Sequence, residues 1–170
     1  HTFRSHGDHG LGPVDMVRAI ILSSNVYFYS LANELGVDTI HDFMKPLGFG
    51  QITGIDLPGE VRGVLPSTEW KRKTYKRPEQ QKWYGGETIS LGIGQGYNTF
   101  TMLQLATATS ALANGGLRMT PRVVQATQDP LTHQSLPVPG TPGQSLGLNP
   151  EHLSVVRNGL VGVTTGGTSA

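Results

Sequence analysis

Clusters of glycine and proline divide this sequence into short apolar segments. The 170 residues include 23 glycines and 11 prolines. Proline lacks the amide hydrogen that helices and strands use, and glycine favours turns and helix ends, so the segments between the clusters are limited to short elements. The length suits one domain, or one large piece of a domain, with a hydrophobic core of its own. We therefore expect a loop-rich globular fold.

Charge and cysteine content exclude several classes of protein. Thirteen lysines and arginines against twelve acidic residues leave a net charge of +1, which is too balanced for a nucleic-acid binder or a polybasic membrane-surface protein. Without cysteine the chain forms neither a disulfide nor a thiolate metal site or nucleophile. No apolar run approaches the roughly 18 residues that cross a bilayer. The chain opens without methionine and ends in a run of small residues, so we expect both ends to lie within a longer protein.

The N-terminal part predicts a helix, a polar turn and two more helices. Pro13 suits a first helical turn, and apolar residues follow it. Residues 23–25, Ser-Ser-Asn, interrupt this helix because their side chains compete for backbone hydrogen bonds. Helical spacing resumes over residues 28–35 and ends at Gly36, and a third helix is expected over residues 39–47.

Turn and cap signals organise the rest of the chain. Residues 54–86 hold three prolines and a basic cluster with few apolar positions in register, which predicts an extended surface excursion. Polar and apolar residues alternate briefly over residues 88–96 and run into glycines, which predicts a short strand entering a tight turn. A helix capped by Thr99 or Thr101 should follow. The remaining elements are an extended piece at 121–127, a loop over 129–148 and a final helix with Asn149 as N-cap and Pro150 in its first turn.

The turn Ser23-x-Asn25 has a chemical use beyond capping. A hydroxyl can relay a proton, and a carboxamide offers both a donor and an acceptor to a substrate amide. The same residues also suit a plain helix break with Ser23 or Asn25 as N-cap, which is the commoner meaning of so short a pattern. The residues alone leave both interpretations open.

The glycines of residues 92–96 have the composition of a dinucleotide-binding loop. Their spacing does not fit G-x-G-x-x-G, and no apolar parallel strand precedes them. We therefore interpret Gly94, Gln95 and Gly96 as a tight turn.

Two charged clusters have ligand-binding chemistry. His6, Asp8 and His9 are residue types that bind metals, but adjacent Asp8 and His9 suit one tetrahedral site poorly, so we predict no metal. The basic cluster from Lys71 to Arg77 lies near aromatic residues that could stack on a ligand, but we favour a solvated loop as its explanation.

Several short motifs follow one another in a specific order. They are VDMVRAI (14–20), SSNVYFY (23–29), LANELG (31–36), GFG (48–50), TGIDLPGE (53–60), GIGQG (92–96), QLA (104–106) and ANGG (113–116). In this order they resemble the transpeptidase domain of class B penicillin-binding proteins, most of all the branch that acts in Gram-negative cell elongation. The similarity runs from about residue 14 to residue 170.

The resemblance implies an α+β fold of the penicillin-binding protein and serine β-lactamase-like type, with a helical lobe packed on a five-stranded antiparallel sheet. It implies a serine acyl transferase that cross-links peptidoglycan stem peptides and is acylated by β-lactams. It gives Ser23 a part in proton transfer with the leaving amine and Asn25 a hydrogen bond to the substrate amide. We expect the turn of residues 94–96 to pack beneath them.

The sequence also departs from this family. The family's S-x-x-K and K-T-G motifs do not occur, so we expect residues 1–170 to be a central fragment, mostly the helical lobe and connecting loops, without catalytic activity of its own. Similar proteins that hold zinc beside the turn use a cysteine at the spacer, which is Ser24 here, and no cofactor is implied. Apolar helix faces that would pack on the missing sheet are expected to be exposed.

The resemblance further implies partners and a location. Stem peptides and β-lactams are the implied ligands, and membrane proteins of the elongation complex are the implied partners of the longer protein; nucleic acid is not. An N-terminal helix outside this chain would anchor that protein at the periplasmic face of the inner membrane. The alternatives are a serine β-lactamase-like hydrolase, a β-lactam sensor or a non-catalytic scaffold, between which sequence outside this chain decides.

Overall fold

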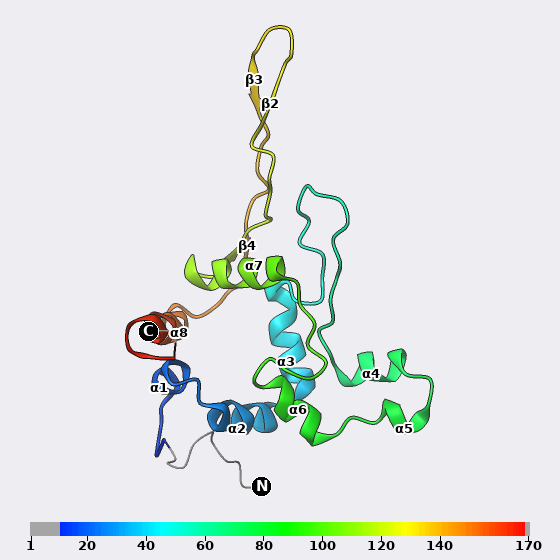
Figure 1. Cartoon of the computed structure of the whole chain (residues 1–170), viewed down its shortest axis with the longest axis vertical. Helices are drawn as coiled ribbons and strands as arrows, with labels where there is room; N and C mark the ends of the chain where they lie inside the picture. Colours follow the sequence, from blue (N-terminus) through cyan, green and yellow to red (C-terminus); the bar gives the residue numbers. More distant parts are fainter. Residues whose placement is uncertain (1–10, 169–170) are drawn as a thin grey trace.

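The computed structural model describes residues 11–168, which form a helical body with a long hairpin projecting from it (Figure 1). The four short strands lie in two separate antiparallel pairs. In chain order the elements are α1 (Met16–Ile21), α2 (Asn25–Leu35), α3 (Val37–Met44), η1 (Lys45–Leu47), α4 (Thr68–Thr74), α5 (Pro78–Gln81), α6 (Gly85–Leu91), α7 (Met102–Ala113), β1 (Leu117–Arg118), β2 (Ala126–Gln128), β3 (Ser135–Pro137), β4 (Gln144–Ser145) and α8 (Pro150–Gly166).

The first helix begins later than the sequence predicts. The Asp15 carboxylate accepts a hydrogen bond from the Arg18 amide at 2.8 Å and caps α1, so Pro13 lies before the helix and not in its first turn. A side-chain cap satisfies an amide that the helix leaves unpaired, which explains why the boundary falls here. The end of α2 is as predicted, because Gly36 has a positive φ of 78° that favours glycine.

Helix α1 packs against α8 through two glycines (Figure 1). A Cβ atom at Gly159 would lie 2.9 Å from Ile20 Cδ1, and one at Gly162 would lie 2.5 Å from Ile21 Cδ1. Any larger side chain at these positions would push the two helices apart. Asn149 caps α8 as predicted, so the start of one of the two helices in this contact is predictable from the sequence.

The core lies between η1, the segment around Leu65 and α7. Leu47, Phe49, Leu65 and Ala108 are its buried members. The rings of Phe49 and Phe100 add an aromatic contact with centroids 4.5 Å apart, in the range that favours ring pairs. Short helices and loops thus share one core, as the loop-rich sequence leads us to expect.

Gln104, in the first turn of α7, ties a loop to this core. The Thr101 hydroxyl accepts from the Gln104 backbone amide at 3.1 Å, which confirms the predicted cap. The Gln104 side-chain oxygen in turn accepts from the Thr101 amide at 3.1 Å and completes a capping box. The Gln104 side-chain amide donates to the carbonyls of Gln51 and Arg62, the latter at 2.8 Å. Gln104 is 1% exposed, and these bonds offset the cost of burying its polar atoms. The loop 51–62 is therefore held to α7 at both ends.

Residues 54–86 are not the extended surface excursion that the sequence predicts. They contain α4, α5 and the start of α6, and the stretch Leu65, Pro66 and Ser67 is buried. Ser67 caps α4 by accepting from the Trp70 amide at 3.0 Å. The prediction is wrong because the partners that bury this stretch come from distant parts of the chain, which its own periodicity does not reveal.

Residues 88–91 form the end of a helix and not a strand. The Glu87 carboxylate accepts from the Tyr84 amide at 2.8 Å, which helps to start α6. A run of four alternating residues is compatible with both the strand period and the helix period. The packing of α6 on α2 stabilises the helix. The tight turn predicted after them is confirmed, with positive φ angles at Gly94 and Gly96.

The segment after α7 is a hairpin and not the loop predicted for residues 129–148. β2 pairs with β3, with Thr127 opposite Leu136, and β1 pairs with β4, with Leu117 opposite Ser145. Figure 1 shows the hairpin extending away from the body beyond α7. The extended conformation predicted up to residue 127 is confirmed only at its end, in β2.

A carboxylate clamps the base of this hairpin to the loop 51–62. The two oxygens of Asp56 accept from the amides of Val123 and Val124, at 2.7 and 2.8 Å. These two hydrogen bonds favour the ionised carboxylate and lower the pKa of Asp56 below its usual 3.8.

The clamp should weaken in acid. Because the folded pKa of Asp56 is lowered, its contribution is fully present above pH 3.8 and is lost as the pH falls from 3.8 through the lower folded value. We expect the Val123 and Val124 amides to lose hydrogen-exchange protection over that range, while the helical Leu153 amide, which donates to the Asn149 carbonyl, keeps its own. Protection that stays constant down through this range would contradict the clamp.

Candidate functional site

The turn between α1 and α2 carries both candidate catalytic residues. The amides of Ser23 and Ser24 donate to the carbonyls of Ile20 and Ala19, at 3.1 and 2.9 Å, and close the turn. Ser23 has a positive φ of 50°, which is uncommon for a residue with a Cβ atom. Strained backbone of this kind concentrates at functional sites.

Ser23 and Asn25 are exposed, and Ser24 between them is only 4% exposed. Asn25 is the first residue of α2. The Ser23 hydroxyl lies 2.8 Å from the hydroxyl of Thr168, which follows α8, and either group can donate in this pair. Two joined hydroxyls form a short path for a proton. The fold thus brings the segment after α8 to the residues that the sequence singles out.

The glycine turn is built on the end of α6. The Gly94 amide donates to the Leu91 carbonyl at 2.9 Å, and the Gln95 amide donates to the Ser90 carbonyl at 3.0 Å. A Cβ atom at Gly94 would meet nothing within 4 Å, whereas one at Gly96 would contact Ser90 at 3.4 Å. The turn therefore has room around it and is fixed mainly by its own backbone.

Helix α6 approaches α2 through Gly92. A Cβ atom here would lie 2.5 Å from the Ala32 Cβ and 2.8 Å from the Phe28 carbonyl oxygen. Phe28 is three residues after Asn25, so this contact supports the first turn of the helix that Asn25 begins. The glycine segment therefore contacts α2 at Ala32 and Phe28.

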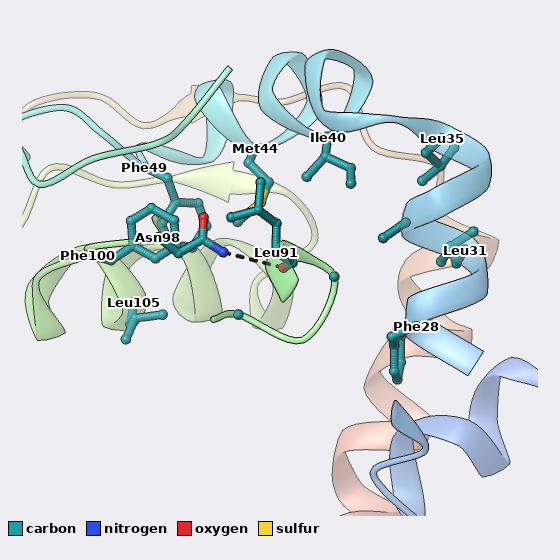
Figure 2. A pocket seen from close by; sticks show the side chains of 13 residues that line it. Phe28, Leu31, Leu35, Ile40, Met44, Phe49, Leu91, Asn98, Phe100 and Leu105 are labelled. Carbon is teal, nitrogen blue, oxygen red and sulfur yellow. Dashed lines mark hydrogen bonds between the residues drawn. The ribbon is translucent and has the colours of Figure 1, made fainter. Parts of the chain in front are cut away.

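An apolar hollow lies beside the glycine turn, with a volume of about 530 Å³. Figure 2 shows Phe28, Leu31 and Leu35 of α2 on one side, and Phe49 and Phe100 across from them. Asn98 supplies its one polar side chain, and that amide donates to the Leu91 carbonyl at 3.4 Å. The hollow holds neither a nucleophile nor an acid or base. It is an open apolar face to which α2 and α3 contribute.

Lys71, from the basic cluster, is buried and not solvated. It is 3% exposed, its ammonium donates to the Lys82 carbonyl at 2.8 Å, and it forms an ion pair with Glu87. Its Nζ atom also lies 5.4 Å from each of three ring centroids, those of Trp83, Tyr84 and Tyr97. A solvated loop is therefore the wrong explanation for Lys71, whose charge holds α4 to α6.

The ion pair shapes the titration of its neighbours. Burial opposes ionisation of Glu87, but hydrogen bonds from Lys71, the Tyr84 amide and Tyr97 outweigh it and lower the pKa of Glu87. Burial, and then the hydrogen bond to Glu87, raise the pKa of Tyr97 to about 12. Tyr97 therefore stays protonated at neutral pH and donates to Glu87 at 3.0 Å.

The described residues contain no group of three or more histidine, cysteine, aspartate or glutamate side chains placed to hold a metal. His6, Asp8 and His9, the candidates from the sequence, lie outside residues 11–168, which the structure describes.

Sequence reasoning missed three polar residues beside these features. Glu87 carried a signal, because an acidic residue three positions after a non-helical residue is typical of a helix start. Tyr97 and Thr168 carried none, since each meets its partner through contacts between distant segments.

Comparison with known proteins places the chain in one family. The model of the penicillin-binding protein transpeptidase domain matches residues 2–170. The peptidoglycan D,D-transpeptidase MrdA of Acinetobacter baumannii is 48% identical over 139 residues, which cover 81% of this chain and 20% of that protein. The chain spans about a fifth of the length of the curated relatives it matches.

Two solved structures share its fold. One is the Pseudomonas aeruginosa penicillin-binding protein PBP2 in complex with WCK 5153, at 39% identity and a TM-score of 0.78, covering 98% of this chain and 34% of the other. The second is PBP2 in complex with MreC from Helicobacter pylori, at 30% identity and a TM-score of 0.77, covering 98% and 28%. With nearly its whole length matched by the family model and by these folds, the chain belongs to the transpeptidase domain family of penicillin-binding proteins.

Proposed function

We propose that this chain is the central segment of a peptidoglycan D,D-transpeptidase, here called the parent protein. That enzyme cross-links stem peptides by serine acyl transfer and is acylated by β-lactams. The observation that carries the proposal is the exposed pair Ser23 and Asn25 on a strained turn, with the Ser23 hydroxyl bonded to Thr168. Family membership and the name of the Acinetobacter baumannii relative support it.

The nucleophile belongs to another part of the parent protein. Neither S-x-x-K nor K-T-G occurs in the 170 residues, and acyl transfer of this type needs the serine and lysine of the first motif. We therefore propose that the isolated chain is inactive and contributes the S-x-N element to a site that other segments complete.

In this scheme Ser23 moves a proton and Asn25 binds substrate. The outside serine attacks the carbonyl carbon of the penultimate D-alanine, the C–N bond breaks, and Ser23 relays the proton to the leaving amine. An amine of a second stem then attacks the ester, forms the new amide and returns a proton to the serine. The Asn25 carboxamide pairs with the backbone amide of the donor stem throughout.

The parent protein has partners and a place that follow from this role. We propose stem peptides and β-lactams as ligands, and membrane proteins of the elongation complex as partners, in line with the Helicobacter pylori complex of PBP2 and MreC. We also propose that a helix outside this chain anchors it at the periplasmic face of the inner membrane. Among residues 11–168, the helices are all too short or too polar to cross a bilayer.

Intact-mass spectrometry of the parent protein after incubation with a β-lactam tests the proposal. One covalent adduct that persists is expected, because the acyl group of a β-lactam blocks the incoming amine. Absence of any adduct would contradict the proposal. An adduct that forms and is hydrolysed within seconds would instead favour the β-lactamase-like alternative.

A further inference from the structure

The basic arm, defined here as residues 68–84, concentrates positive charge. It carries six of the thirteen lysines and arginines of the chain and only two of the twelve acidic residues. The net charge of +1 therefore conceals a strongly positive arm on a slightly negative remainder. Figure 1 shows α4 and α5 on the side of the molecule away from α1 and α8, and so away from the Ser23 turn.

The arm is held in a fixed position. The Thr68 amide and hydroxyl donate to the Asp38 carboxylate, at 2.9 and 2.7 Å, which joins the start of α4 to α3. The buried Lys71 ties α4 to Glu87 on α6. The Gln81 side chain donates to the Tyr75 carbonyl at 2.9 Å and closes the connection between α4 and α5. Charges on this arm thus occupy defined positions.

Four cations of the arm lack an acidic partner. Lys71 is paired with Glu87 and Lys73 with Glu69, and these are the two ion pairs found within the described part of the chain. The other four cations of the arm are exposed, and among residues 11–168 no carboxylate lies within ion-pairing distance of their side chains. They are Arg72, Lys76, Arg77 and Lys82. Exposed cations on a rigid frame bind multivalent anions without first having to break an internal ion pair.

The surface around these cations favours a soluble polyanion over a bilayer. Between Val61 and Met102 the only large hydrophobic residue that is exposed is Tyr84, at 51%. Helices that bind bilayers present an apolar face for insertion, and the arm has none. Lys82 Nζ lies 5.5 Å from the centroid of the Tyr84 ring, so a flat ring stands beside the cations. Guanidinium groups pair with carboxylates, and an exposed ring can stack on a sugar.

We propose that the basic arm docks peptidoglycan through the carboxylates of its stem peptides, at a surface remote from the S-x-N turn. The inference rests on the proposed function, which brings this polymer to the domain. Because stem peptides repeat along a glycan strand, one strand engages several cations at once, and binding at the arm raises the concentration of other stems near the catalytic turn.

Co-sedimentation of the parent protein with purified peptidoglycan sacculi tests the arm. The arm variant carries Arg72→Gln, Lys76→Gln and Arg77→Gln, and the matched control carries Arg62→Gln, Arg122→Gln and Arg157→Gln, which removes the same number of charges from exposed positions elsewhere. We expect the arm variant to bind about tenfold more weakly at low salt. We expect the control to bind like wild type. With sacculi whose carboxylates have been amidated, we expect the arm variant and wild type to bind equally.

Each other outcome overturns the proposal. Equal affinity of the arm variant and wild type removes the arm from binding, and equal loss in the control reduces the effect to overall charge. A deficit of the arm variant that persists with amidated sacculi excludes carboxylates as the ligand. A difference seen only with phosphatidylglycerol vesicles assigns the arm to a membrane, and one seen only with an acidic protein assigns it to that class. β-Lactam acylation should be the same in all three proteins, so failure of acylation in wild type would remove the proposed function separately.

Discussion

Replacing Ser23 by alanine in the parent protein is expected to slow acylation by a β-lactam about 100-fold or more, because a positioned proton-transfer group contributes at least that factor. The effect should fall on the rate of acylation and not on the affinity for the β-lactam, since the hydroxyl moves a proton and its bond in the structure is to Thr168. Asn25→Ala should instead weaken binding about tenfold, the value of one hydrogen bond to substrate. Stopped-flow acylation over a range of β-lactam concentrations separates the two quantities.

Ser30→Ala supplies the matched control. Ser30 is an exposed serine on α2, and its hydroxyl donates to the Val26 carbonyl of its own helix at 2.9 Å. The Ser30→Ala variant should react with the β-lactam at the wild-type rate. If Ser23→Ala and Ser30→Ala react at the same rate, the turn between α1 and α2 has no part in proton transfer.

Replacing Lys71 by methionine should be the most destabilising change in the basic cluster. Methionine keeps the length of the side chain but leaves the Glu87 carboxylate, whose side chain is 22% exposed, without its cation. Removing one partner of a largely buried pair costs on the order of 3 kcal/mol. The expected observation is a clear fall in the unfolding midpoint of the parent protein, measured by calorimetry.

Lys73→Met is the control for Lys71→Met, because Lys73 pairs with Glu69 on the open surface of the same helix, with side chains 76% and 65% exposed. The unfolding midpoint of the Lys73→Met variant should equal that of wild type within error. Adding Glu87→Gln to Lys71→Met should recover part of the lost stability, since no unpaired charge then remains near the rings. Equal midpoints for the two lysine variants would show that Lys71 contributes nothing through its charge.

The elements that the sequence predicts well are those with local signals. The cap at Thr101, the end of α2 at Gly36 and the start of α8 at Asn149 depend on residues within one helical turn. The break between the first two helices is also predicted locally, although backbone amides close the turn at Ser23 and Ser24 and α2 already begins at Asn25. These features need no knowledge of what lies across the core.

The failures share one cause, which is dependence on distant contacts. Lys71 looks like its solvated neighbours Arg72 and Lys73, and only the approach of α6 buries it. Residues 88–91 alternate like a strand, yet the close contact of Gly92 with α2 fixes them as a helix. For the candidate site the sequence identifies Ser23 and Asn25, whereas the Thr168 partner of Ser23 is 145 residues away and invisible to any local pattern.

Because Gln104 binds both ends of the loop 51–62, the number of residues between these ends can change while the ends stay in place. The two carbonyls that Gln104 holds fix the distance between the ends of the loop, whatever lies between them. Doubling the length of such a loop adds only about 0.6 kcal/mol of closure entropy. Insertions or deletions between Gln51 and Arg62 would therefore alter the reach of Asp56 toward the hairpin and leave α7 and the core where they are.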